Sequence, residues 1–479
     1  MSEALIACSI IFAILAITII IGLLAYKRGV KALKVDTYAV AGRKLGFIVT
    51  FLNMAAVIYS GFAFLGASGW AYAYGAPVLY IWIYGALAYT FAFFFAPRIW
   101  KIAREKGFYT QGDYFTWRYG SKLLMVLVAL VGIAFNIPYG QLQILTTKYV
   151  LDLSTYGALP TLHVAVISFI VVMIYVFLGG MVSVAITNVF LGAIMLAAMI
   201  GGGLSLIVHY FGGFPGLFKA VEAVSPKHLY LWASVGRNSI QWVITAAVGC
   251  GLGFWCWPQL AQTIFPAKDP KVLRRSIMMN SWYQFGMIIA SLTGLVALAT
   301  GLQLKVADHA FLTLVKDTFG PVALGLIGAA GMAAALSTAA GILLTQSVLL
   351  ARNIYQGWIK PNASEREVVI VSRIGVVLFT VISVILAYTS PAYLVYLLLV
   401  GYTGVTQLFP GWVLGTLWKW ITKEGVLSGL VVGLIVGVLT VFVWPDYLGI
   451  HSIIWGLMFN LPITLIVSKL TYKGEEVKA

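Results

Sequence analysis

Long apolar runs alternate with short polar stretches along the whole chain. Because the hydrocarbon core of a bilayer is about 30 Å thick, a helix needs about 20 apolar residues to cross it. The pattern therefore predicts an all-α polytopic membrane protein without a separate soluble domain. Thirteen runs are long enough to span, and they cover approximately residues 4–26, 46–71, 77–97, 123–147, 158–178, 181–209, 239–263, 276–301, 320–350, 369–389, 392–417, 425–444 and 450–468.

The composition agrees with a lipid environment. Hydrophobic residues make up 61% of the 479 residues and charged residues only 10%, whereas soluble domains carry roughly 25% charged residues. All fifteen acidic residues lie in polar stretches, so we expect no carboxylate at mid-membrane, where a charge costs at least about 2.5 kcal/mol. The three cysteines, Cys8, Cys250 and Cys256, lie in apolar runs and are interpreted as core residues.

The basic residues are distributed unevenly between the two sides that these helices define. Six Lys and Arg residues lie on one side, namely Lys148, Lys219, Lys227, Arg237, Lys305 and Lys316, and the other twenty-five lie on the opposite side. Because the richer side normally faces the cytoplasm, we predict a plasma-membrane protein with its N-terminus outside and its C-terminus inside. The net charge of +16 then reflects topology and contact with anionic lipid headgroups, which argues against a nucleic-acid partner.

Two of the predicted helices are interrupted in a related way. The second run contains Tyr-Ser-Gly at 59–61, and the seventh contains Gly-Cys-Gly-Leu-Gly at 249–253. Glycine weakens a helix, and the two interruptions are about 190 residues apart, close to the spacing between the fourth and ninth runs. Broken helices in corresponding positions are typical of inverted-repeat transporters. The alternative is that these glycines only allow helices to pack closely.

This spacing predicts a transporter domain built from two repeats of five helices. We expect an extra N-terminal helix and loop over 4–45, a first repeat over 46–209, a second repeat over 239–417, and two C-terminal helices with a tail over 425–479. In this fold the broken helices expose backbone groups near the middle of the membrane, where ion and solute bind.

The ninth run carries two adjacent hydroxyl groups, Ser337 and Thr338, among the small residues of 333–341. Two hydroxyl oxygens and a few backbone carbonyls suit a hard monovalent cation, and the break in the second helix can provide the carbonyls. Hydroxyls in membrane helices also commonly bond to carbonyls of their own helix, so the residues alone leave both interpretations open.

Five short segments, in order along the chain, resemble the sodium:solute symporter family. They are AVAGRKLG at 39–46, YTQGDY with RYG at 109–120, GGM at 179–181, WCWPQ with AKD at 255–269, and LST running on to NIY at 336–355. Within this family the chain most resembles the monocarboxylate-permease branch, through ASG and AYAYG at 67–75, PYGQLQ at 138–143, RNIY at 352–355 and QLFP at 407–410. The pantothenate branch has a similar AYxYG stretch, so the solute stays open.

The resemblance implies a site for Na⁺ as the coupling ion, without an organic cofactor. Carried over residue by residue, its ligands are the carbonyls of Ala56, Tyr59 and Ala334 and the hydroxyls of Ser337 and Thr338.

Two departures from the family pattern limit this transfer. Asn188 stands where many members have aspartate, and Ile58 stands where the proline-transporting branch has aspartate. A second sodium site or a proton relay that needs these carboxylates is therefore in doubt. Ala63 stands where the sugar-transporting branch has glutamine, which argues against a hexose.

A small anionic solute suits a pocket without acidic groups, since free N–H groups at the helix breaks and neutral donors can hold it. The candidate solute contacts are Ser60, Gly61, Tyr139, Gln143, Phe254 and Gln407. Phe254 is included because it matches the aromatic inner gate of the sugar branch. Each of these residues can instead make a contact between helices without touching the solute.

The sequence therefore favours a sodium-coupled symporter that imports a small solute, most simply a monocarboxylate, and not an enzyme. A proton-coupled transporter of the same fold, for pantothenate, an amino acid or another small solute, is the main alternative, with His163 as the possible proton carrier. A membrane enzyme needs a nucleophile, base or metal cluster, and the chain has no paired His/Asp/Glu motif. A channel needs a continuous polar pore.

Overall fold

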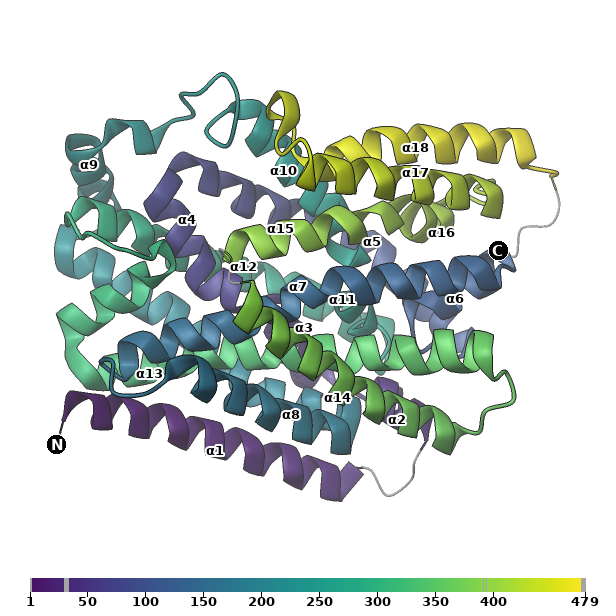
Figure 1. Cartoon of the computed structure of the whole chain (residues 1–479), viewed down its shortest axis with the longest axis horizontal. Helices are drawn as coiled ribbons and strands as arrows, with labels where there is room; N and C mark the ends of the chain where they lie inside the picture. The colour runs from purple at the N-terminus through teal and green to yellow at the C-terminus, as the bar shows by residue number, and fades with distance from the viewer. Residues whose placement is uncertain (1, 30–33, 391, 393, 475–479) are drawn as a thin grey trace.

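The apolar runs form a bundle of long helices that lie roughly along one direction (Figure 1). A computed structural model describes residues 2–29, 34–390, 392 and 394–474. The helices in these residues are α1 (Glu3–Gly29), α2 (Val35–Val40), α3 (Phe47–Ile58), α4 (Ala67–Tyr74), α5 (Leu79–Lys106), α6 (Gln111–Tyr119), α7 (Lys122–Ser154), α8 (Thr161–Phe211), α9 (Phe214–Val224), α10 (Ile240–Gly253), α11 (Pro258–Gln262), α12 (Pro270–Ala299), α13 (Ala310–Val348), α14 (Glu365–Thr389), α15 (Leu394–Val405), α16 (Gly415–Leu417), α17 (Lys423–Phe442) and α18 (Ser452–Thr471).

The predicted thirteen runs all correspond to helical segments. Within the described residues, ten helices are long and apolar enough to cross a membrane, or eleven when α3 and the bent segment after it count as one span. The longest, α8, changes direction at Gly180 (φ 53°, ψ −140°), so it accounts for the fifth and sixth runs. The seventh run is the shorter apolar helix Ile240–Cys256 together with α11.

The second helix is broken where the sequence predicts. The helix α3 ends at Ile58, and Tyr59 leaves helical geometry with φ −88° and ψ 87°. The chain becomes helical again in the π-helical turn Phe62–Gly66 and continues into α4. The two halves are bent by 64° relative to each other.

The break in the seventh helix lies downstream of the predicted position. The helix α10 runs through all three glycines to Gly253, a tight turn covers Phe254–Cys256, and Trp257 is extended (φ −60°, ψ 123°). Pro258 follows directly, and a residue before proline is disfavoured in helical geometry. The proline, not the glycine cluster at 249–253, therefore explains where this helix breaks.

The glycines of α10 instead allow close packing, which was the alternative interpretation of this cluster. A Cβ atom at Gly249 would lie 2.6 Å from Ile453, and one at Gly253 would lie 1.9 Å from Thr406 Oγ1. Through these contacts α10 packs against α18 and the segment that follows α15. Close packing at this point positions the residues of the break.

The helices outside the predicted repeats lie on opposite sides of the bundle (Figure 1). The helix α1 runs along α8 and α13, while α17 and α18 pack side by side as an antiparallel pair. The basic connections that contain α2 and α6 lie at the end of the bundle away from the N-terminus (Figure 1). The division of the chain into two repeats with the stated boundaries stays a prediction.

We predict that Gly253→Ala destabilises the protein, because the added methyl group would collide with the buried Thr406 side chain. Overpacking of this kind costs about 1–3 kcal/mol, so thermal unfolding of the purified protein in detergent should begin several degrees lower. Gly201→Ala in α8 is the matched control, since open space surrounds that position. Equal melting temperatures for the two variants would contradict this account of the glycine cluster.

Candidate ion and solute site

Hydroxyl groups of α13 meet backbone carbonyls at the end of α3. Ser337 Oγ donates to Ala56 O at 2.7 Å and also lies 3.2 Å from Ala334 O. Thr338 Oγ1 lies 3.2 Å from Val57 O and 3.3 Å from Ala56 O. Both hydroxyl side chains are fully buried. The structure therefore gathers two hydroxyl and three carbonyl oxygens, from two helices far apart in the sequence, into one cluster.

The break in α3 makes two of these carbonyls available. In a continuous helix, the carbonyls of Ala56 and Val57 would accept bonds from the N–H groups of Ser60 and Gly61. The Ser60 N–H instead donates to Ile58 O at 3.1 Å, and the Gly61 N–H donates to Gln143 Oε1 at 3.2 Å. The freed carbonyls are satisfied by the hydroxyls of α13, as buried carbonyls must be.

Small residues allow α13 to approach this break. All residues of α13 from Gly328 to Val348 are buried, and a Cβ atom at Gly341 would lie 3.0 Å from the Val57 side chain. A larger residue there would push the two helices apart.

Four of the five predicted sodium ligands, Ala56, Ala334, Ser337 and Thr338, contribute oxygens to this cluster. Tyr59, the fifth, is the residue at which α3 ends. The sequence prediction did not include Val57, whose carbonyl contacts Thr338. The spacing of carbonyls next to a helix break could have identified it, because the break frees consecutive carbonyls.

A small cavity of about 20 Å³ adjoins the break. None of the residues that line it carries a formal charge. Of the predicted solute contacts, Tyr139 and Phe254 line it, and Tyr59 of the predicted ion site does as well. The full lining consists of Ile58, Tyr59, Phe62, Ala63, Tyr84, Tyr139, Phe254, Trp257, Leu260, Gln284, Met287, Leu398 and Tyr402.

Ser60, Gly61 and Gln143 form the break itself. The Phe62 N–H donates to Ser60 Oγ at 3.2 Å, and the Gln143 amide accepts from the Gly61 N–H while its Nε2 donates to Tyr139 O. A Cβ atom at Gly61 would lie 2.1 Å from Thr146 Oγ1, which explains the glycine. Gln143 therefore holds the break from α7 and is not among the residues that line the cavity.

Gln407 differs from its predicted role as a solute contact. Its side-chain amide donates to Thr403 O and to Ile453 O, and its Oε1 accepts from Asn460 Nδ2 at 3.1 Å. Gly433 and Gly456 pack directly against the same amide. The Gln407 side chain therefore has partners in α15 and α18, packs against Gly433 of α17, and is not among the residues that line the cavity.

Asn188 and His163 take positions that bear on additional ion pathways. Asn188 Nδ2 donates to Asn53 Oδ1 at 3.0 Å, so a neutral amide pair stands where many members of the resembled family have a carboxylate. His163 is exposed on the side of the bundle, with its ring 5.7 Å from that of Tyr388. His163 is not among the residues that line the cavity.

Aromatic side chains that the sequence prediction did not include close the cavity. The Tyr84 ring lies 6.0 Å from that of Phe254 and 6.2 Å from that of Tyr402. On another side, Tyr59 Oη bonds to Tyr89 Oη at 2.6 Å, and the Tyr59 ring stacks on Tyr283. With 67 aromatic residues in the chain, no sequence pattern distinguishes these from the others.

Comparisons with known proteins agree with this architecture. A family model described as "Sodium:solute symporter family" matches residues 38–433. An uncharacterized symporter, YhjB, of Bacillus subtilis is 32% identical over 99% of both chains. A monocarboxylate transport permease protein of Rhizobium johnstonii is 26% identical over 83% of this chain and 81% of its own. A sodium/proline symporter of Staphylococcus aureus is 28% identical over 95% and 91%.

The fold also matches a solved structure along its whole length. A Na⁺-coupled sialic acid symporter in a substrate-bound outward-open state superimposes with a TM-score of 0.80 and 19% sequence identity, covering 98% of both chains. This likeness confirms the predicted transporter fold with its broken second and seventh helices. With the family match over most of its length, this chain belongs to the sodium:solute symporter family.

Proposed function

We propose that the protein is a sodium-coupled symporter that imports a small monocarboxylate by alternating access. The observation that carries this proposal is the oxygen cluster of Ser337, Thr338 and the α3 carbonyls beside the break. The monocarboxylate permease among the relatives supports the solute class, and the sodium/proline symporter supports sodium as the coupling ion.

The oxygen cluster fits Na⁺ in its chemistry. Its ligands are neutral hydroxyl and carbonyl oxygens, the ligand type that hard monovalent cations prefer, and a single charge does not require a carboxylate. In the structure the hydroxyl protons of Ser337 and Thr338 point to carbonyls. A bound ion would take the place of these protons as the partner of Ala56 O and Val57 O, and would join α3 to α13 more strongly.

The absence of charge around the central cavity favours an anion that travels with the ion. In a medium of low dielectric constant, an isolated charge is costly and opposite charges attract strongly. Sodium at the break would give the neighbouring cavity one positive charge, which a carboxylate neutralises. An amino acid would add an ammonium group, and none of the cavity residues offers it an acidic partner.

The cavity of about 20 Å³ has room for about one water molecule, so solute binding must widen it. The aromatic residues around it, Tyr84, Phe254 and Tyr402, come from three different helical segments. We infer that movement of these segments relative to α3 opens the cavity to one side at a time. The orientation with the N-terminus outside and the C-terminus in the cytoplasm is part of this proposal.

Proton coupling is the alternative for the same fold. His163, the proton carrier named for this alternative, is exposed and does not line the central cavity, which favours sodium as the coupling ion. Uptake measured with and without a sodium gradient, at one fixed pH on both sides, separates the two coupling ions.

We predict that the double variant Ser337→Ala and Thr338→Ala raises the sodium concentration for half-maximal uptake at least about tenfold, or about 1.4 kcal/mol of binding free energy. We expect this increase because the variant lacks two oxygen ligands of the ion. The sodium concentration for half-maximal uptake is measured from initial uptake rates in proteoliposomes at varied external sodium. Ser347→Ala is the control, since that hydroxyl bonds only within α13, to Leu344 O. Unchanged sodium dependence in the double variant would refute the site.

We predict that Tyr139→Phe raises the solute concentration for half-maximal uptake about tenfold, because a hydrogen bond to a charged group contributes roughly 1.5 kcal/mol. At saturating solute, the sodium dependence should stay unchanged. Tyr388→Phe in α14, at an exposed position on the outside of the bundle, is the control. Equal solute dependence for Tyr139→Phe and the wild type would remove Tyr139 from the binding site.

Solute identity is tested with labelled lactate, pyruvate, acetate, pantothenate, proline and glucose in the same vesicles. We expect sodium-dependent uptake of one or more of the three simple monocarboxylates. Uptake of proline or glucose alone would overturn the proposed solute class and leave the proposed coupling ion in place.

A further inference from the structure

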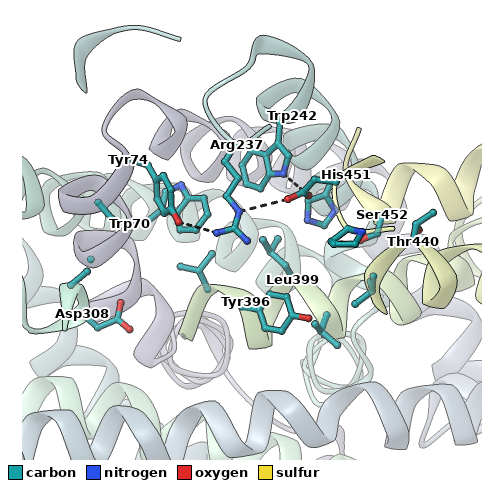
Figure 2. Close-up of a pocket in the computed structure, with 18 of the residues that line it drawn as sticks. Trp70, Tyr74, Arg237, Trp242, Asp308, Tyr396, Leu399, Thr440, His451 and Ser452 are labelled. Carbon is teal, nitrogen blue, oxygen red and sulfur yellow. Dashed lines mark hydrogen bonds and ion pairs between the residues drawn. The ribbon is translucent and has the colours of Figure 1, made fainter. Parts of the chain in front are cut away.

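A second, much larger cavity lies at the end of the bundle that we infer to be extracellular. Its volume is about 410 Å³, about twenty times that of the central cavity. The end of α4, the loop before α10, the loop before α13, the start of α15 and the loop between α17 and α18 all contribute to it. Figure 2 shows aromatic and charged side chains around its rim.

Arg237 is held in place at this cavity. Its Nη1 donates to Tyr74 Oη at 2.9 Å, and its guanidinium carbon lies 5.6 Å from the centre of the Trp70 ring and 5.7 Å from that of Tyr74. Its Nε lies 3.6 Å from Asp446 Oδ2. A guanidinium has five N–H donors in a fixed fork, so these contacts leave donors for a further acceptor.

Two acidic residues line the cavity. Asp446 accepts from Trp242 Nε1 at 2.9 Å and pairs with Arg237 (Figure 2). Asp308 is only 3% exposed and packs against Gly69, and its Oδ2 has no hydrogen-bond partner among the described residues. Burial lowers the pKa of His451 to about 4, so this side chain is neutral near pH 7. Lys305 adds an exposed positive charge.

We propose that this cavity is an outer capture site, in which Arg237 binds the carboxylate of the solute before the solute reaches the central cavity. Arginine binds a carboxylate through two parallel N–H donors, and the apolar part of a small carboxylate can rest against Trp70 and Leu399 (Figure 2). The choice of a carboxylate rests on the proposed function. Capture at this site requires no sodium, because the oxygen cluster lies elsewhere.

A continuous series of aromatic rings connects the two cavities. Trp242, at the outer cavity, lies 5.4 Å from Tyr80, Tyr80 lies 6.0 Å from Tyr84, and Tyr84 lines the central cavity. These buried rings form a packed layer between the two cavities. Under the proposal, this layer must move before a solute can pass from the outer site to the central cavity.

The first test is binding of labelled pyruvate to the purified protein, by equilibrium dialysis in sodium-free buffer. We expect the wild type to bind pyruvate and Arg237→Gln to bind it at least tenfold more weakly. Lys219→Gln, on α9 and outside the cavity, removes the same charge and should bind as the wild type does. Absence of sodium-free binding in the wild type, or equal binding by Arg237→Gln, would overturn the proposal.

A second test separates this proposal from the proposed function and from a structural role of Arg237. Arg237→Lys keeps the positive charge but lacks the paired N–H donors of the guanidinium. We therefore expect it to bind pyruvate better than Arg237→Gln and less well than the wild type, with a melting temperature like that of the wild type. In the double variant Ser337→Ala and Thr338→Ala, sodium-free binding should persist. Loss of sodium-free pyruvate binding in this double variant would overturn the proposal of an independent outer site. If the wild type binds pyruvate at the outer site but shows no sodium-dependent uptake, only the proposed transport function is contradicted.

Discussion

The site depends on carbonyl groups that the chain leaves without a helical partner. Where α3 ends, the N–H groups that would have bonded to Ala56 and Val57 donate elsewhere, and hydroxyls from α13 take their place. Buried carbonyls need partners, so this break is stable only while α13 stays close. The packing of α13 against the end of α3, the 64° bend of the second helix and the oxygen cluster therefore depend on one another.

Much of this architecture follows from local sequence patterns. The apolar runs predict the membrane-spanning helices, because each helix must be long enough to cross the hydrocarbon core of the bilayer. Ser337 and Thr338 are candidates as adjacent hydroxyls among small residues, and the family resemblance favours them as ion ligands over bonds within their own helix. The position of the seventh-helix break was missed because glycine was weighted above Pro258, although only the proline restricts the residue before it.

Partners that come from distant segments could not be predicted in the same way. Gln407 is a candidate solute contact from the sequence because its neutral amide can donate to an anionic solute. The partner it finds is Asn460 of α18, and no local pattern connects two residues in separate helices. Arg237 lies in a polar loop, where an arginine is ordinary. Its importance appears only when the fold places Trp70, Tyr74 and Asp446 around it.

Charge is placed in this protein according to the local cost of carrying it. Four charged residues, Arg237, Lys305, Asp308 and Asp446, line the outer cavity, whereas the residues around the central cavity are all neutral. A fixed positive charge beside the central cavity would hold an anion there but would repel the sodium ion that the oxygen cluster suits. Under the proposed function, a sodium ion and an anionic solute in this neutral cavity would provide each other's counter-charge. Neither is then bound tightly without the other, and this mutual dependence is the physical basis of coupled transport.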